Sequence, residues 1–561
     1  MSQDDNQNNI PENPEDEHGM ELLDPADDNE LPQKKTPFGD FGFEKQEYNQ
    51  TLNFNQQNFH NQIAKNLEQN DSDDENNDAD PEDLIPKTPT EMNKTLDDIF
   101  TAQMFGIRDP NEKIVPFDSR KAGMFERMLH PMQYGSLRGS IFALSSMCLD
   151  TGTLVLAKKC QDFGLINFLI AIIIGGCLAY WSLTMMIRAA RNMKERDYSK
   201  VVKATLGPKV GMFLDCNITL YLFGVLISFQ VIIYSLVASL GFDIYKIMNP
   251  EDKKSYEDYK TEYFGEKGIT CLITYGVVIC VLPLCLLKDV SKMRFASLIG
   301  VMALAYSILV IVIESPFFFV INDYSINDLN LFDITKAFNP KNISFFSCIA
   351  TVFFIYSCHA GAFPVYKTLR NNTTRRIKKV FRRSILLDMI IYFSVALASY
   401  LTNPKEPQDL ILFRESFWKH DYFIMLAKVG IIFNLFFSTP PNYAALRISV
   451  FELIWGNTNI TTVKNIIVTV GLMGIIGTIA IVYPEIMPYI SLLGGFCSVV
   501  YCYLIPGLIY VKNNKLPWKA SSNLITLIIV ITLTVIGYTA GVFTILFDIV
   551  KITKKEENKN K

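Results

Sequence analysis

Histidine is scarce in this chain, with five residues among 561, and tryptophan is scarcer still, with four. The motifs that carry common enzyme chemistry are also missing. The sequence contains no phosphate-binding Gly-x-x-x-x-Gly-Lys loop, no His-Glu-x-x-His zinc motif and no Gly-x-Ser-x-Gly nucleophile motif. These absences argue against an enzyme and against an ATP-driven pump.

Net charge is also small, at −4, but it is unevenly distributed. Residues 1–100 hold 26 Asp and Glu against six Lys and Arg, a balance of −20, so the rest of the chain carries +16. No soluble module is basic, which argues against a nucleic-acid binder. The first 100 residues are rich in Asn, Gln, Asp, Glu and Pro and are predicted to be disordered. Their start lacks a basic stretch followed by an apolar one, so we predict no signal peptide.

One short pattern in the acidic segment is typical of a sorting signal. Asp80, Leu84 and Ile85 match an acidic dileucine signal, which a sorting adaptor would read. Such a signal would direct the protein to vacuolar or lysosomal membranes. Acidic segments also produce this pattern by chance, so the plasma membrane remains an alternative.

Long apolar runs are abundant after residue 136. A helix needs about 20 apolar residues to cross a bilayer, and eleven stretches qualify: 137–157, 165–187, 210–241, 268–287, 295–313, 344–365, 384–402, 421–442, 465–483, 489–510 and 521–548. The predicted fold class is an all-α polytopic membrane protein. We predict a disordered acidic cytoplasmic tail over 1–134, an eleven-helix domain over 135–550 and a short Lys-rich C-terminal tail over 551–561.

Orientation follows from the Lys and Arg residues between the spans. If the N-terminus is cytoplasmic, the inside loops hold 23 basic residues and the outside loops hold 12. Because positive residues remain on the cytoplasmic side, we predict a cytoplasmic N-terminus. Nearly all of the eleven cysteines lie within spans, where they act as small apolar residues rather than as a disulfide framework.

Two predicted spans contain residues that interrupt a membrane helix. The first has hydroxyls, the carboxyl of Asp150 and then Gly152 at membrane depth, and the sixth has His359, Gly361 and Pro364. Unpaired backbone groups are costly in lipid, so such interruptions are tolerated where they line a cavity. Breaks at matching places in two halves of a chain indicate a transporter's binding site.

The sequence around these breaks resembles a known family. The stretch from Gly152 to Gly164 resembles the first-helix signature of the amino acid/auxin permease family, and 354–366 resembles its sixth helix. Blocks at 206–209, 283–297 and 484–509 fit as well. The nearest branch is that of the sodium-coupled neutral amino acid transporters, and the resemblance covers about 136–548.

This resemblance implies a fold and a binding site. The fold is a five-plus-five inverted repeat, with helices 1 and 6 broken, plus one extra helix. The implied substrate-binding residues are Asp150, Thr151, Gly152, Tyr356, Ser357, Cys358 and His359. The first three would hold the substrate carboxylate, and carbonyls of the sixth helix would receive the amino group. The implied Na⁺ positions are Ser146, Ser438 and Thr439.

Departures from the family pattern leave substrate and coupling ion open. Ala157-Lys158 stands where the family has Pro and an aromatic residue, and Asp150 stands where small or neutral residues are usual. The amino acid substrate is therefore neutral or cationic, and the coupling ion is H⁺, carried by Asp150 or His359, or Na⁺. We predict secondary active transport by alternating access, without a cofactor. The alternative is an amino-acid sensor that signals through its tail, and a channel is harder to exclude.

Other polar residues within the spans are predicted to be structural. Asp215, Asn217 and Asp388 are expected to form interhelical hydrogen bonds or to lie at interfaces, and Lys428 either pairs with Asp150 or extends to the membrane boundary. Most Tyr and Phe residues are expected to face lipid or to lie in interfacial belts.

Overall fold

A computed structural model describes most of the chain after residue 134. The described residues are 135–149, 151–249, 251, 254, 256–264, 267–287, 294–325, 328–331, 344–369, 372–405, 407–408, 410–413, 421–456, 461–514 and 520–559. They all belong to the compact unit Asp78–Lys561. The predicted tail over 1–134, with Asp80, Leu84 and Ile85, lies outside the described residues, as does Asp150.

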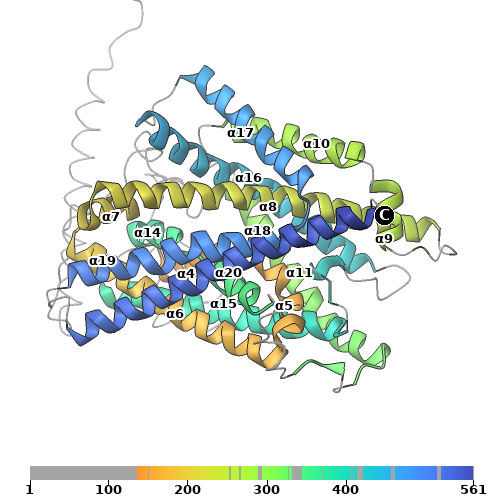
Figure 1. Cartoon of the computed structure of the whole chain (residues 1–561), viewed down its shortest axis with the longest axis horizontal. Coiled ribbons are helices and arrows are strands. Elements are labelled where there is room, and N and C mark those ends of the chain that lie inside the picture. The colour runs from red at the N-terminus through yellow and green to blue at the C-terminus, as the bar shows by residue number, and fades with distance from the viewer. Residues whose placement is uncertain are drawn as a thin grey trace, which may run out of the picture. The chain divides into compact units, whose positions relative to one another are not determined.

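The described part of the chain is helical and contains no strand (Figure 1). The helices that form the predicted spans are α4 (Leu137–Cys148) with η2 (Thr151–Val155) and α5 (Leu156–Phe163), α6 (Leu165–Asn192), α8 (Pro208–Met248), α10 (Lys267–Cys285), α11 (Arg294–Ile321), α13 (Ser344–Ile355) with α14 (His359–Thr368), α15 (Thr374–Thr402), α16 (Tyr422–Trp455), α17 (Thr462–Val482), α18 (Ile486–Leu492) with the π-helical turns η7 (Leu493–Ser498) and η8 (Val500–Leu504) and with α19 (Ile505–Asn513), and α20 (Ser521–Lys559).

Shorter elements lie between the spans. They are α7 (Tyr198–Leu206), α9 (Tyr256–Tyr259), the π-helical turn η3 (Lys260–Phe264) and η6 (Ile411–Phe413). The described residues contain ten helices long and apolar enough to cross a membrane, or eleven when the bent pair α4 and α5 counts as one span. The prediction of an all-α protein with eleven spans is therefore confirmed. The inverted repeat remains a prediction.

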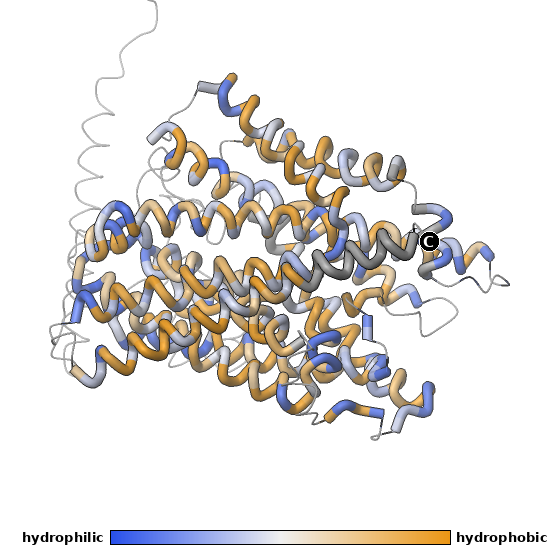
Figure 2. The backbone as a smooth tube through the Cα atoms, viewed as in Figure 1, coloured by the Kyte–Doolittle hydropathy of each residue, from blue (hydrophilic) through white to orange (hydrophobic). Residues whose placement is uncertain are grey.

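The ends of these helices follow from local sequence. Ser136, Asp197, Thr373 and Asp421 precede α4, α7, α15 and α16, and each side chain accepts a hydrogen bond from a backbone N–H of the first turn. Such caps satisfy amides that have no partner inside the helix. Within the spans the residues are almost continuously apolar (Figure 2).

Helix α8 lies at the centre of the packing. It contacts α16 along much of its length, and α16 in turn packs on α11. The spans α8, α13–α14 and α18–α19 are mostly buried, whereas α10, α17 and α20 are largely exposed along apolar faces. Exposed apolar residues such as Leu272, Val320 and Val482 suit contact with lipid rather than water. Helices α4 and α5 of the first interrupted span pack on α15. Helix α13 of the second packs on α5 and α6, which in turn pack on α15.

Candidate functional site

The first interrupted span breaks between α4 and η2. Helix α4 ends at Cys148, and the segments Leu137–Cys148 and Gly152–Phe163 meet at an angle of 51°. Gly152 lies at this break, and a Cβ atom there would come within 2.8 Å of Ile355 Cγ2 and 3.1 Å of the Phe354 ring. A residue without a side chain is therefore needed where the first break contacts the end of α13.

The second interrupted span breaks between α13 and α14. Three residues after Ile355, namely Tyr356, Ser357 and Cys358, are not helical, and α14 begins at His359. Further along α14, a Cβ atom at Gly361 would overlap the Met147 sulfur at the end of α4. The two breaks, each predicted from a polar stretch in the sequence, thus lie against each other.

Tyrosine hydroxyls satisfy the free backbone groups at the breaks. Tyr392 on α15 lies 2.6 Å from the Cys148 carbonyl oxygen and 2.7 Å from the Ile355 carbonyl oxygen. Tyr501 in η8 donates to the Ser357 carbonyl at 3.0 Å. Because a carbonyl at a helix end has no intrahelical partner, these hydroxyls stabilise both interruptions.

The side chains of the second break are buried, or half-buried at Ser357, and contact several helices. The Ser357 hydroxyl donates to the Phe354 carbonyl at 2.5 Å, so its 2.9 Å contact with Tyr221 on α8 has the tyrosine as donor. The Tyr356 hydroxyl donates to the Ile172 carbonyl on α6 at 3.0 Å. The break is therefore held in place from α6, α8, α15 and η8.

Helix ends at the two breaks create a dipolar environment. The C-terminal carbonyl ends of α4 and α13 meet the N-terminal amide ends of the Gly152–Phe163 segment and of α14. Carbonyl ends carry partial negative charge and amide ends carry partial positive charge. The arrangement therefore suits a small molecule that carries both a positively and a negatively charged group.

Family and sequence comparisons identify what kind of protein contains this arrangement. The family model "Transmembrane amino acid transporter protein" matches residues 133–549. The chain belongs to this family. It is therefore a multi-pass membrane protein of a family of amino acid transporters, and the predictions of family and of a non-enzymatic role are confirmed.

Curated relatives agree with this assignment. The transporter is 20% identical over 393 residues to "Sodium-coupled neutral amino acid symporter 2" of Danio rerio, an alignment that covers 67% of this chain and 75% of the relative. It is 23% identical over 391 residues to "Sodium-coupled neutral amino acid transporter 7" of Xenopus laevis, covering 67% and 81%. These names match the predicted branch.

Solved structures show a more distant likeness. A structure of MhsT in complex with L-phenylalanine is 14% identical, covering 74% of this chain and 99% of that chain at a TM-score of 0.45. A substrate-bound Na⁺-coupled sialic acid symporter is 12% identical, covering 73% and 95% at a TM-score of 0.37. TM-scores of this size support no conclusion about the transporter.

The residues predicted for substrate fall into two groups. Gly152, Tyr356, Ser357, Cys358 and His359 lie at the two breaks, as described above. Only the backbone of Thr151 is described, as the first residue of η2. The His359 ring is fully buried, and neither of its nitrogens has a hydrogen-bond partner among the described residues.

The predicted Na⁺ positions donate hydrogen bonds inside their own helices. The Ser146 hydroxyl donates to the Ala143 carbonyl at 2.9 Å, and the Thr439 hydroxyl donates to the Leu435 carbonyl at 2.8 Å. Ser438 faces the Asn434 side chain at 3.5 Å. Within the described residues no hydrogen bond joins Ser146 to Ser438 or Thr439, and their role as Na⁺ ligands remains a prediction.

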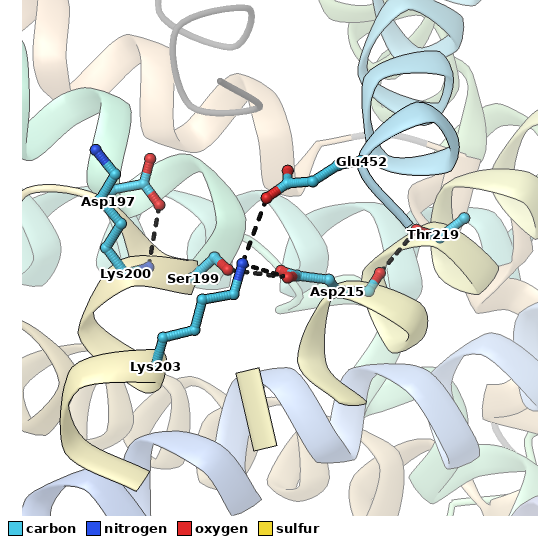
Figure 3. Close-up of polar contacts among 7 residues, drawn as sticks. All are labelled: Asp197, Ser199, Lys200, Lys203, Asp215, Thr219 and Glu452. Atoms are coloured by element: carbon cyan, nitrogen blue, oxygen red, sulfur yellow. Dashed lines mark hydrogen bonds and ion pairs between the residues drawn. The ribbon is translucent and has the colours of Figure 1, made fainter. Parts of the chain in front are cut away.

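Lys428 differs from expectation, whereas Asp215 forms the interhelical contacts that are expected of it. Lys428 does not extend to the membrane boundary: it is buried and forms an ion pair with Asp243 on α8, at 2.5 Å. Asp388 is fully buried where α15 faces Ser145 and Cys148 of α4, and among the described residues neither of its oxygens meets hydrogen-bond geometry with a donor. Asp215 forms an ion pair with Lys203 on α7 at 3.0 Å, and Lys203 also contacts Glu452 on α16 at 3.4 Å (Figure 3).

The sequence interpretation missed the tyrosines of the site. Tyr221, Tyr392 and Tyr501 were grouped with lipid-facing and interfacial aromatics, but Tyr392 and Tyr501 are fully buried and Tyr221 is half-buried. A hydroxyl in an apolar span needs a hydrogen-bond partner, and this requirement could have marked these tyrosines as buried. The helix face on which each tyrosine lies could not be derived from a uniformly apolar sequence.

Proposed function

We propose that this protein is a secondary active transporter that moves neutral amino acids across a membrane by alternating access, in symport with a cation. The observation that carries the proposal is the meeting of two broken helices in the buried interior, where Tyr392 contacts carbonyls of both. Both relatives described above bear names of sodium-coupled neutral amino acid transport. Amino acid transport itself follows from the family.

Helix ends at the breaks suit the backbone of an amino acid. Amide groups from Thr151 onward would bind the substrate carboxylate, and carbonyls near Ser357 would receive its ammonium group. The breaks are enclosed by apolar side chains such as Phe354 and Ile355. A buried apolar pocket with a few polar groups favours neutral side chains.

Glycine residues at the contacts between the two interrupted spans would allow these spans to move. At Gly152 and Gly361 a side chain would collide with Ile355 and Met147 respectively. Small residues at helix contacts allow backbones to approach and to slide past each other. In alternating access, α4–α5 and α13–α14 would tilt against α8 and α16, which form the most extensive contact between helices.

We propose a cytoplasmic N-terminus, with the acidic tail and the basic start of α15 on the same side. The support is the excess of 23 over 12 basic residues in the loops on that side. A vacuolar or lysosomal membrane is the location proposed from Asp80, Leu84 and Ile85, with the plasma membrane as the alternative.

The coupling cation is H⁺ or Na⁺. The half-buried hydroxyls of Ser146 and Ser438 and the buried hydroxyl of Thr439 would supply oxygen ligands for Na⁺. For H⁺, Asp150 or His359 would carry the proton. Asp150→Asn tests whether the carboxyl next to the first break sets substrate charge preference or the pH dependence of uptake. Unchanged uptake across pH and across an amino acid panel would remove Asp150 from the mechanism.

Reconstitution into liposomes tests the proposed function. The full chain and a variant lacking residues 1–134 are compared for uptake of a panel of radiolabelled amino acids, with Na⁺ or H⁺ gradients imposed in turn. We expect saturable uptake of neutral amino acids above the equilibrium level by both proteins. Tight binding of an amino acid without uptake would instead support the sensor, whose motivation is the long tail with a charge of −20.

A further inference from the structure

Asp388 is the most isolated charged residue that the structure describes inside a span. It lies near the middle of α15, its side chain is 0% exposed, and the Ser145 hydroxyl and the Cys148 thiol face it. Among the described residues neither donor meets hydrogen-bond geometry with its carboxyl oxygens. An isolated carboxylate in an apolar interior is very costly, because it loses its hydration without gaining a partner. The carboxyl must therefore be held as the neutral acid or bind a cation in this conformation.

Few groups surround this carboxyl. Ser145 and Cys148, at the end of α4, face it from the side of the first break. The other titratable groups facing it are the phenols of Tyr356 and of Tyr392, one turn further along α15. Helices α5, α6 and α11 also pack on α15, but none of their described side chains forms an ion pair or hydrogen bond with Asp388.

The buried cation that the structure describes on α5 has another partner. Lys159 on α5 is 3% exposed, and its amino group donates to the Ser347 hydroxyl on α13 at 2.6 Å. It therefore does not neutralise Asp388. Since no described basic side chain pairs with the carboxyl, a mobile cation is the remaining means of neutralisation.

We propose that Asp388, in place of Asp150 or His359, is the proton-binding residue that couples amino acid transport to a proton gradient. This inference rests on the proposed transport function and deepens it. A hard metal cation requires several oxygen ligands, but the side chains that face Asp388 are one hydroxyl, one thiol and two phenols. Both phenols already donate to backbone carbonyls. A proton requires only the carboxylate oxygen to which it binds. It is taken from water on one side of the membrane and released to water on the other.

The position of Asp388 explains how proton binding would affect the substrate site. Its carboxyl lies beside the carbonyl end of α4, which carries partial negative charge. The neutral acid tolerates this contact, whereas an ionised carboxylate would be repelled by it and would draw in water. One turn away, Tyr392 contacts carbonyls of both breaks. Loss of the proton would therefore loosen α4 from α15 next to the substrate site.

The test compares wild type with Asp388→Asn in liposomes that contain the full chain. Asn has nearly the same shape as the neutral acid but cannot carry a proton. We expect accumulation driven by a pH gradient to fall roughly tenfold or more, while exchange of internal for external amino acid persists. The exchange rate should also lose its dependence on pH. The matched control is Asp323→Asn, at an exposed position after α11 with φ of 50°, a conformation that Asn adopts readily.

The possible results distinguish the assignment of Asp388 from the proposed transport function. Accumulation by Asp388→Asn at the wild-type level under a pH gradient overturns the assignment and leaves the transport function intact. Wild-type uptake that is driven by Na⁺ and lost in Asp388→Asn also overturns it, because the carboxylate then binds Na⁺. Failure of wild type to move any amino acid under either gradient contradicts the proposed function itself.

A second variant tests the assignment if Asp388→Asn loses all transport activity. If Asp388→Asn abolishes exchange as well as accumulation, Asp388→Glu is measured, since Glu retains a carboxyl that can carry a proton. Recovery of uptake driven by a pH gradient in Asp388→Glu supports the assignment. A correctly folded Asp388→Glu protein without such uptake overturns it.

Discussion

The hydroxyl of Tyr392 lies 2.6 Å from the carbonyl oxygen of Cys148, the residue at which α4 ends. The same hydroxyl lies 2.7 Å from the carbonyl oxygen of Ile355, at which α13 ends. One phenolic proton therefore serves two carbonyls, each at the end of a broken helix. Movement of either helix end changes the hydrogen bond available to the other, so this residue connects the two breaks.

Removing this hydroxyl should weaken both breaks. In Tyr392→Phe two buried carbonyls lose their donor, and an unsatisfied buried group costs about 1–3 kcal/mol. We expect a lower melting temperature and a lower maximal rate of amino acid uptake. The control is Tyr306→Phe, which removes a hydroxyl that bonds the Phe423 carbonyl between α11 and α16, away from the breaks. Equal uptake by both variants would show that Tyr392 does not act at the site.

Lys428 and Asp243 should stabilise the protein only when both are present. Breaking a buried ion pair by removing one partner costs about 3–5 kcal/mol, because a charge remains without compensation. We expect Lys428→Met and Asp243→Leu each to lower the melting temperature markedly in thermal unfolding of the purified protein. The double variant should recover much of the loss. A double variant whose loss equals the sum of the two single losses would show that the two residues act independently.

The surface cluster around Lys203 should contribute less and should respond to salt. Burial of its amino group opposes charging, but hydrogen bonding to Asp215 and the charges of Asp215 and Glu452 raise the pKa of Lys203 above its ordinary value. Each exposed ion pair contributes about 0.2–1 kcal/mol, less at high salt. Lys203→Gln should therefore lower the melting temperature slightly at low salt and hardly at all at high salt, with Lys200→Gln on the same helix as control.

The pH dependence of the Lys203 cluster follows from the direction of the shift. A base whose pKa is higher in the folded state contributes its full stability below the unfolded pKa of about 10.4. The contribution is lost only as pH rises through the higher folded pKa. The difference in melting temperature between wild type and Lys203→Gln should therefore be constant near neutral pH. A difference that changes between about pH 6 and pH 9 would contradict this explanation.

Gly494 should tolerate no side chain. It lies in η7, where a Cβ atom would overlap the carbonyl oxygen of Ala350 on α13 and lie 3.1 Å from Phe354. Because a backbone carbonyl cannot move aside as a flexible side chain can, Gly494→Ala should reduce the yield of folded protein in size-exclusion chromatography. Gly471→Ala on α17 is the control, since nothing lies within 4 Å of its Cβ position. There Ala should be neutral or stabilising by about 0.5–1 kcal/mol.

The sequence predicted the spans and their breaks because both depend on local features. An apolar run of sufficient length marks a span, and the polar residues around Gly152 and His359 mark places where a helix cannot continue easily. The partners of buried polar groups depend instead on helix rotation and on contacts between residues far apart in the chain. Lys428 and Asp243 are 185 positions apart, and no local pattern links them.

Tyr392 and Asp388 illustrate the same limit within one helix. Both lie in α15, whose outer and inner faces are similarly apolar near these positions. Periodicity therefore could not show that Tyr392 contacts the two breaks and that Asp388 faces the end of α4. The family resemblance indicated the binding segments, but it did not indicate the residues that hold those segments in place.

Counterflow in liposomes tests the central claim most directly. Liposomes containing the purified chain are loaded with an unlabelled neutral amino acid and diluted into a trace of the labelled one. An alternating-access transporter should take up label transiently above its equilibrium level, in a saturable manner, and Tyr392→Phe should reduce the initial rate. Uptake that only approaches equilibrium without saturating, or no uptake beyond that of protein-free liposomes, would contradict the account.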